Sequence, residues 1–141
     1  MRAHPWPFLD DPAPIGFAHR GDGLLPENTM AAFESAVRLG YRYIETDVQA
    51  TRDGVAVAFH DDTLDRLGGR GGRVRDLPWS EVRRIKIDDR EPMARLDEIL
   101  DTWPYIRVNV DPKSDAAVDP LIEALHHADA VERVCLASFS D

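Results

Sequence analysis

The chain has 141 residues, of which 43% are hydrophobic and 30% are charged, a composition typical of one globular domain with its own core. Its formal net charge of −9 argues against nucleic acid as a partner and against attraction to an anionic membrane surface. No apolar stretch approaches the roughly 20 residues of a spanning helix, and the N-terminus lacks an apolar segment of signal-peptide length. We therefore expect no stable membrane insertion and a cytoplasmic location.

Residues 1–14 contain four prolines and the acidic pair Asp10-Asp11, which predicts an irregular leader ahead of a domain over residues 15–141. The elements predicted after it, in chain order, are a strand (15–18), a helix (29–39), two strands joined by a turn (41–48 and 55–59), a short helix that begins near 78–81, a helix (96–103), a strand (105–110), a helix (115–128) and a strand (134–137).

Local signals refine these elements. Asn28 or Thr29 would cap the first helix and Ser80 the second, and the glycine-rich residues 61–78 predict a flexible surface loop. The single cysteine, Cys135, rules out an internal disulfide and fits a reducing compartment. Because it lies in the apolar run of residues 134–137, we expect a buried structural thiol.

Strands that alternate with helices predict an α/β fold with a parallel sheet, whose faces must both be covered. The sequence stops just past a predicted strand, with no closing helix. Because a (β/α)8 barrel typically needs about 250 residues, we expect the first half of such a barrel: about four barrel strands and a small hairpin insertion. The missing C-terminal half of the barrel would then be a partner.

Charged residues follow or interrupt several of the apolar runs. Glu45 and Asp47 lie two residues apart, so strand alternation places them on one face. Asn109, Asp111 and Lys113 would share a face in the same way if the later strand stays extended through Pro112. Catalytic and binding sites form at the carboxyl ends of parallel strands, so these side chains predict a site there.

Three carboxylates aimed into one space repel one another, and a hard divalent cation relieves that repulsion. We therefore expect Glu45, Asp47 and Asp111 to hold Mg²⁺ or Ca²⁺, which prefer oxygen ligands. The structural alternative is that Glu45 and Asp47 pair with arginines such as Arg42 or Arg107.

His19 and His60 each end an apolar run, and imidazole is suited to general acid and base work near neutral pH. Arg20 and Lys113 would hold the phosphate oxygens of a phosphodiester as charge builds up, or form salt bridges to Glu45 or Asp111, or do both.

Glu27 and Asn28 precede the first predicted helix and admit two roles. They could cap that helix and interact favourably with its dipole. Alternatively, they could orient Arg20 or a substrate hydroxyl.

Taken together, these residues resemble the glycerophosphodiester phosphodiesterase family. The resemblance rests on several ordered motifs: His19-Arg20-Gly21, Pro26-Glu27-Asn28-Thr29, Ile44-Glu45-Thr46-Asp47-Val48, Thr51-Arg52-Asp53-Gly54 and His60-Asp61-Asp62-Thr63-Leu64-Asp65-Arg66. It is dense over residues 15–66 and thinner to the end of the chain.

The resemblance implies a TIM barrel, a divalent metal, and hydrolysis of glycerophosphodiesters to glycerol 3-phosphate and an alcohol. It implies His19 and His60 as the acid and base, Glu45 and Asp47 as metal ligands, and Arg20 and Lys113 as phosphate contacts. The third ligand of the family is usually glutamate, and Asp111 stands there in this sequence. Two alternatives remain open: a phospholipase D-type activity on lysophospholipids or sphingolipids, and a non-catalytic half-barrel.

Overall fold

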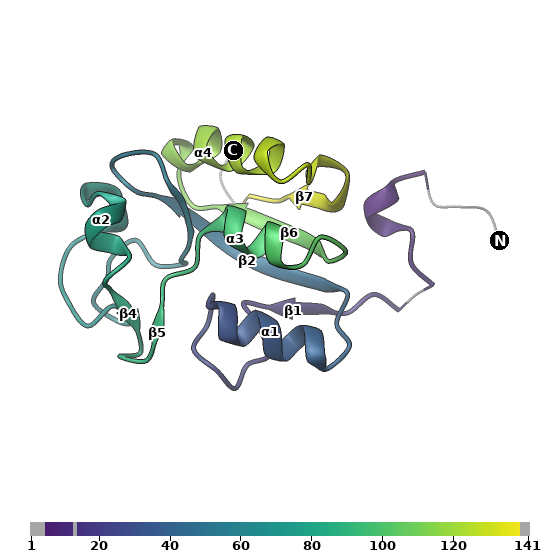
Figure 1. The fold of residues 1–141 in the computed structure, drawn as a ribbon, viewed down its shortest axis with the longest axis horizontal. Coiled ribbons are helices and arrows are strands. Elements are labelled where there is room, and N and C mark those ends of the chain that lie inside the picture. Colours follow the sequence, from purple (N-terminus) through teal and green to yellow (C-terminus); the bar gives the residue numbers. More distant parts are fainter. Residues whose placement is uncertain (1–4, 13, 139–141) are drawn as a thin grey trace.

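The computed structural model describes residues 5–12 and 14–138, so part of the predicted leader (1–4 and 13) and residues 139–141 lie outside it. A sheet organises the described residues (Figure 1). Its parallel strands follow the order β1 (Phe17–His19), β2 (Tyr43–Ala50), β6 (Arg107–Pro112) and β7 (Val134–Leu136), and β3 (Ala56–Ala58) pairs antiparallel with β2. The predicted parallel sheet with a hairpin is confirmed.

Three helices cover one face of this sheet: α1 (Met30–Arg38), α3 (Leu96–Thr102) and α4 (Val118–His127). Short 3-10 turns, η3 (Asp115–Ala117) and η4 (Val131–Arg133), flank α4. The alternate strand residues Ile44, Val48, Val108 and Val110 are fully buried in one apolar core with side chains from these helices. Thr29 is the N-cap of α1, because its Oγ1 accepts a hydrogen bond from the Ala32 amide at 3.2 Å.

The opposite face of the sheet, here called the inner face, carries the polar residues. Parallel pairing of β1, β2, β6 and β7 aligns one residue from each strand in a row: His19, Glu45, Asn109 and Cys135. Two residues further along the strands, it aligns Asp47 with Asp111. Cys135 is exposed, so the prediction of a buried thiol is wrong. The apolar run around it is an edge strand, and alternation places Cys135 on the inner face, away from the helices.

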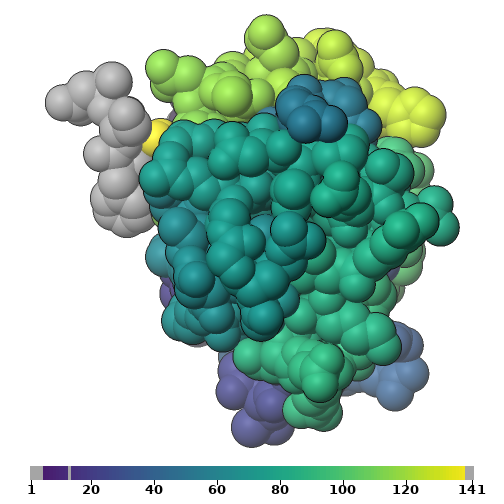
Figure 2. Space-filling model, turned by 90° about the vertical axis from the view of Figure 1, so that its left-hand side faces the viewer, coloured from purple at the N-terminus to yellow at the C-terminus, as the bar shows by residue number. Residues whose placement is uncertain are grey.

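Residues 59–95 form a second packed unit, the insertion, with the elements η2 (Val74–Asp76), α2 (Trp79–Val82), β4 (Lys86–Ile87) and β5 (Glu91–Pro92). It projects beyond the end of the sheet and forms the teal and green surface in Figure 2. The predicted loop of residues 61–78 is not a free surface loop, because Leu64, Leu67 and Val74 are buried in a separate apolar cluster with Val82, Ile85, Ile87 and Met93. Pro78, rather than Ser80, is the N-cap of α2.

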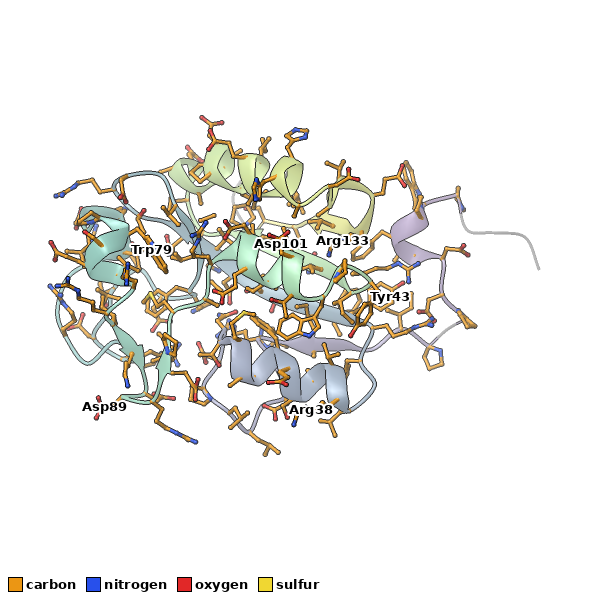
Figure 3. The ribbon with its side chains drawn as sticks, viewed as in Figure 1. Arg38, Tyr43, Trp79, Asp89, Asp101 and Arg133 are labelled. Atoms are coloured by element: carbon orange, nitrogen blue, oxygen red, sulfur yellow. The ribbon has the colours of Figure 1, made fainter. Side chains whose placement is uncertain are left out.

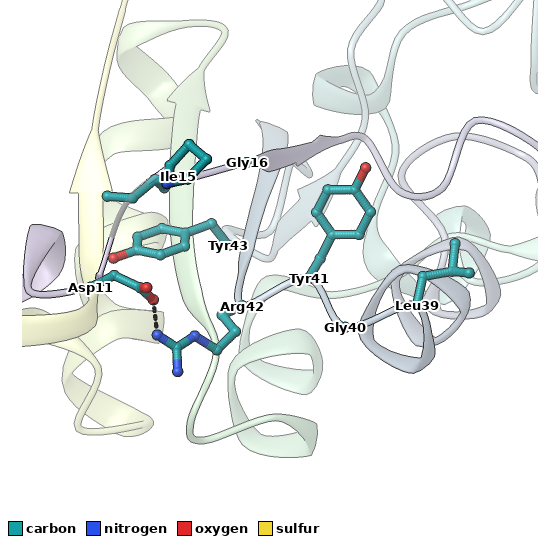
Figure 4. A pocket seen from close by; sticks show the side chains of 9 residues that line it. Asp11, Ile15, Gly16, Leu39, Gly40, Tyr41, Arg42 and Tyr43 are labelled. Atoms are coloured by element: carbon teal, nitrogen blue, oxygen red, sulfur yellow. Dashed lines mark hydrogen bonds and ion pairs between the residues drawn. The ribbon is translucent and has the colours of Figure 1, made fainter.

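The described leader packs against the amino ends of the strands. It contains a 3-10 turn, η1 (Pro7–Leu9), whose Phe8 ring contacts the rings of Phe17 and Tyr43. The Tyr43 hydroxyl, on the leader side of the sheet in Figure 3, donates a hydrogen bond to the Phe8 carbonyl at 2.6 Å. A shallow pocket opens beside this contact, where Asp11 pairs with Arg42 (Figure 4). None of the described helices is long and apolar enough to cross a bilayer.

The loop after β1 approaches α1 most closely at Gly21. Gly21 has φ +118°, and a Cβ there would lie 2.4 Å from the Ala32 Cβ. Gly23 also has positive φ, +79°, but faces open space. Substitution of Gly23 therefore tests the energetic cost of the backbone conformation alone, whereas substitution of Gly21 adds the cost of a steric clash with Ala32.

We expect Gly21→Ala to lower the free energy of urea unfolding by about 2–4 kcal/mol, because it adds a steric clash to backbone strain. Gly23→Ala should lower it by only about 1 kcal/mol, from strain alone. Equal losses in the two variants would contradict the close contact between the loop and α1.

Candidate active site

Asp47 is the most buried charged group of the site, with 2% of its side chain exposed. Its Oδ2 lies 2.9 Å from Arg20 Nε and accepts a hydrogen bond from Asn28 Nδ2 at 3.1 Å. Its Oδ1 lies 3.5 Å from Lys113 Nζ. A carboxylate this deeply buried is tolerated because it is surrounded by cations and a hydrogen-bond donor. Three predicted site residues therefore meet at Asp47, two from the loop after β1 and one from the end of β6.

The backbone fixes Arg20 and Asn28 in an uncommon conformation. Both have φ of 58°, in the left-handed region that non-glycine residues rarely adopt. The Asn28 amide donates to the Arg20 carbonyl at 2.9 Å, and the Arg20 amide donates to the Glu45 carbonyl at 3.0 Å. These bonds tie the loop after β1 to β2. Strained residues of this kind cluster at functional sites, where the surrounding structure holds them.

Glu45 stands apart from the compensated carboxylates. Its Oε2 is buried and has no hydrogen-bond partner among the described residues, and His19 Nε2 lies 3.6 Å away, beyond hydrogen-bond distance. Burial, followed by the negative charge of Asp47, raises the pKa of Glu45 to about 7, although Arg20 opposes the shift. Glu45 is thus the carboxylate of the site that most lacks a positive partner.

Lys113 links the two neighbouring strands β2 and β6. Its Nζ donates to Asp111 Oδ2 at 3.0 Å and also faces Asp47. Burial opposes the charged form, but the carboxylates of Asp111 and Asp47 outweigh it and raise the pKa of Lys113. The salt bridge between Lys113 and Asp111 therefore exists, and strand β6 stays extended through Pro112, the condition for Asn109, Asp111 and Lys113 to share a face.

The arginine pairings differ in part from those considered. Arg20 pairs with Asp47, and not with Glu45 or Asp111. Arg42 and Arg107 pair with Asp11 of the leader, so they do not neutralise the carboxylates of the site. In the structural alternative, pairing with Arg42 or Arg107 is therefore wrong, whereas Asp47 does pair with an arginine, Arg20.

Glu27 and Asn28 contact the site directly. Glu27 Oε1 lies 3.3 Å from Arg20 Nη1, and Asn28 Oδ1 accepts a hydrogen bond from Thr46 Oγ1 at 2.9 Å. Since Thr29 is the cap of α1, the capping role considered for Asn28 is wrong, and its amide bridges Asp47 and Thr46 instead.

His60 joins the site indirectly. Strand β3 ends at Ala58, on the helix-packed side, so alternation along this strand would not carry His60 to the inner face. His60 Nδ1 lies 2.7 Å from Asp61 Oδ1, and Asp61 pairs with Arg66, which also binds Glu27. Asp61 and Arg66 were not assigned a role from the sequence, although they lie one and six residues after His60.

The donor chemistry of the site suits a hard cation, because Glu45, Asp47 and Asp111 supply carboxylate oxygens and Glu45 has one buried oxygen unsatisfied. Within residues 5–12 and 14–138, however, no three Asp, Glu, His or Cys side chains form a ready-made metal cluster. Arg20 and Lys113 occupy the oxygens of Asp47, and Lys113 also binds Asp111. The three carboxylates therefore provide suitable ligands for a metal, but in this structure Arg20 and Lys113 pair with two of them, Asp47 and Asp111.

Residues 19–141 match the model of the glycerophosphoryl diester phosphodiesterase family. The chain belongs to this family. It is 42% identical to a probable glycerophosphodiester phosphodiesterase 2 of Mycobacterium tuberculosis, over 95% of this chain and 52% of the relative. The family resemblance seen in the sequence is confirmed, and the chain spans about half the length of the curated relatives it matches.

Solved structures of the family share the fold. A glycerophosphodiester phosphodiesterase from Agrobacterium tumefaciens superposes with a TM-score of 0.79 at 32% identity, over 89% of this chain and 57% of that one. A phosphodiesterase from Oleispira antarctica, solved in complex with the product sn-glycerol-3-phosphate, gives a TM-score of 0.76 at 26% identity, over 90% and 58%. The predicted first half of a TIM barrel is thereby confirmed.

The weakly compensated Glu45 should make the free energy of unfolding depend on pH in metal-free buffer. Its pKa is raised from 4.5 to about 7, so the folded state favours the protonated carboxyl. The stabilisation from this protonated form is full below about pH 4.5 and is lost as the pH rises through about 7. Glu45→Gln stays neutral and should exceed the native chain in unfolding free energy by about 1–3 kcal/mol at about pH 8, with little difference near pH 4.5. Urea unfolding with a chelator present measures both.

Glu123→Gln is the matched control, because Glu123 is exposed on α4. It should leave the pH dependence of unfolding unchanged. A Glu45→Gln variant that is less stable than the native chain at alkaline pH would show that the Glu45 carboxylate has a stabilising partner.

Proposed function

We propose that this chain supplies the catalytic site for metal-dependent hydrolysis of glycerophosphodiesters to glycerol 3-phosphate and an alcohol. The observation that carries the proposal is the buried Asp47, on which Arg20 and Asn28 converge from the loop after β1 and Lys113 from the end of β6. Residues 15–141 would form the barrel portion and residues 1–14 its leader. The bound product in the related Oleispira antarctica enzyme supports glycerol 3-phosphate as a product here.

Glu45, Asp47 and Asp111 are the residues we assign to a divalent cation, Mg²⁺ or Ca²⁺. Such a cation would polarise the phosphoryl oxygen and neutralise negative charge that builds up on it. The unsatisfied Glu45 oxygen and the adjacent Asp47 and Asp111 support this assignment.

Arg20 and Lys113 are the groups we assign to the non-bridging oxygens of the phosphate. Each has a charged partner, so its side chain is ordered before substrate binds. Glu27 and Asn28 serve this arrangement, because Glu27 holds the Arg20 guanidinium and Asn28 holds Asp47. Pre-ordered cations stabilise the charge of a transition state without reorganising during the reaction.

His19 and His60 are the proposed proton-transfer residues. Cleavage requires one group to take a proton from the attacking oxygen and another to protonate the departing alkoxide. His19 is 68% exposed on the inner face and lies beside Glu45, and His60 is 34% exposed beside Asp61. Both imidazoles are therefore open to a substrate that enters from solvent.

Metal binding is expected in the 141-residue chain itself. In calorimetry with MgCl₂ or CaCl₂, Glu45→Gln should weaken binding at least about tenfold, because it removes a charged ligand. The substitution is useful here because we expect it not to destabilise the fold. Asp47→Asn should weaken binding similarly, and Glu123→Gln should not. An isotherm unchanged by both Glu45→Gln and Asp47→Asn would remove this site from the proposal.

Turnover is best measured in a completed barrel. We expect the 141-residue chain alone not to hydrolyse glycerophosphocholine, because it spans about half of its relatives. A chimera that joins residues 15–138 to the remaining strands of the Mycobacterium tuberculosis relative should be active with Mg²⁺ or Ca²⁺. His19→Ala and His60→Ala should each lower its kcat by about 10²–10⁴-fold.

His126→Ala provides the control, since His126 is exposed on α4, which packs on the face of the sheet opposite the inner face. All variants should retain the circular dichroism spectrum of the parent chimera. Normal turnover in either the His19→Ala or the His60→Ala variant would exclude that histidine from proton transfer.

A further inference from the structure

A chain of alternating charges runs from His60 to the centre of the site. His60 Nδ1 lies 2.7 Å from Asp61 Oδ1. Arg66 donates to both oxygens of Asp61, from Nε to Oδ2 at 2.7 Å and from Nη2 to Oδ1 at 2.8 Å. Two parallel bonds of this kind fix the direction of a carboxylate as well as its position.

Arg66 continues the chain to the loop after β1. Its Nη2 also donates to Glu27 Oε1 at 2.8 Å, and Glu27 Oε1 lies 3.3 Å from Arg20 Nη1. Arg20 in turn pairs with Asp47. Arg66 therefore connects the insertion, which begins at the end of β3, to the loop that carries the predicted phosphate ligand.

The segment between His60 and Arg66 is anchored on the protein side. Gln49 of β2 donates from Nε2 to the Asp61 carbonyl at 3.1 Å, and Gln49 is itself buried. Leu64 is fully buried and Leu67 nearly so, both in the apolar cluster of the insertion. The carboxylate of Asp61 is thus held from the backbone as well as from Arg66.

We infer that Asp61 and Arg66 are positioning residues for His60. Asp61 holds the imidazole in the tautomer with the proton on Nδ1, and Arg66 holds Asp61 in place and couples it to Glu27 and Arg20. This inference deepens the proposed function, on which the reaction role of His60 rests.

The tautomer follows from what a carboxylate can do. Asp61 is ionised and only accepts hydrogen bonds, so the His60 nitrogen that faces it must carry the proton. In the neutral ring, Nε2 is then the nitrogen left to accept a proton. The hydrogen bonds from Arg66, more than that from His60, keep the pKa of Asp61 well below its usual value despite partial burial.

A partly exposed histidine–aspartate pair by itself would hold an imidazole only weakly. Arg66 changes this, because it supplies charge-assisted bonds to two carboxylates and leaves Asp61 little freedom to turn away. Asp61 and Arg66 act through His60 and need not touch substrate.

Nitrogen-15 NMR of the His60 ring in the 141-residue chain tests the inference without turnover, under alkaline conditions where imidazoles are neutral. The native chain should show the Nδ1–H tautomer as the main form. Asp61→Ala should lower the ratio of the Nδ1–H to the Nε2–H tautomer at least about tenfold, because a charge-assisted hydrogen bond is lost. Arg66→Gln, which keeps Asp61 but frees it, should shift the ratio in the same direction by a smaller factor.

Asp62→Ala and Arg73→Gln are matched controls. Asp62 is the next residue along, 64% exposed, and pairs with Arg73 at 3.4 Å rather than with His60. Neither control should change the His60 tautomer. An unchanged tautomer ratio in both Asp61→Ala and Arg66→Gln, with the circular dichroism spectrum retained, would overturn the inference, and so would an equal shift in the Asp62→Ala control.

Kinetics in the chimera separate this inference from the proposed function. Asp61→Ala should lower kcat about 10–100-fold with KM little changed, since the loss lies in proton transfer rather than in phosphate binding. An inactive chimera with native His60 would contradict the proposed function, while the tautomer measurement would still decide the positioning role. Full turnover in Asp61→Ala despite a shifted tautomer would overturn the catalytic importance of positioning.

Discussion

The buried carboxylate of Asp47 is the constraint on which the rest of the site depends. A charge with 2% exposure cannot persist without compensation, because an uncompensated buried ion typically costs several kcal/mol. The chain provides compensation from the loop after β1 through Arg20 and Asn28, and from the end of β6 through Lys113. Strands β2 and β6 and the loop that follows β1 must therefore keep the relative positions seen in the structure. Even the left-handed backbone of Arg20 and Asn28 is held by this requirement.

Strand periodicity is what made much of this site predictable. Glu45 and Asp47 share a face because β2 is regular across both, and Asp111 aligns with Asp47 because β6 stays extended through Pro112. The same argument does not extend to His60, because β3 ends two residues earlier. The prediction for Cys135 rests instead on its apolar run, which does not guarantee burial, whereas alternation directs this residue to the inner face. Alternation gives a relative direction, and only the neighbouring elements decide which direction is buried.

The packed structure of the insertion could not be predicted from the sequence, for a different reason. Its glycines and charged residues suggested a loose loop, yet Leu64, Leu67 and Val74 pack against residues that lie up to about thirty positions further on. No local periodicity marks such a cluster, because its apolar residues come from short turns and two-residue strands. Asp61 and Arg66 were missed with it. The contact of Arg66 with Glu27 joins residues 39 positions apart, a pairing that only the folded chain brings together.

The balance of charge around Asp47 explains why an anionic substrate would need a cation there. Glu45, Asp47 and Asp111 outnumber Arg20 and Lys113, so the cluster is negative when Glu45 is ionised and neutral at best when it is protonated. A phosphodiester would meet arginine and lysine groups that carboxylates already neutralise. One divalent cation held at Glu45 would make the net charge of the cluster positive. The positive charges of Arg20 and Lys113 would then be available to a phosphate. Under the proposed function, the unsatisfied oxygen of Glu45 would thus serve phosphate binding through the cation that it helps to hold.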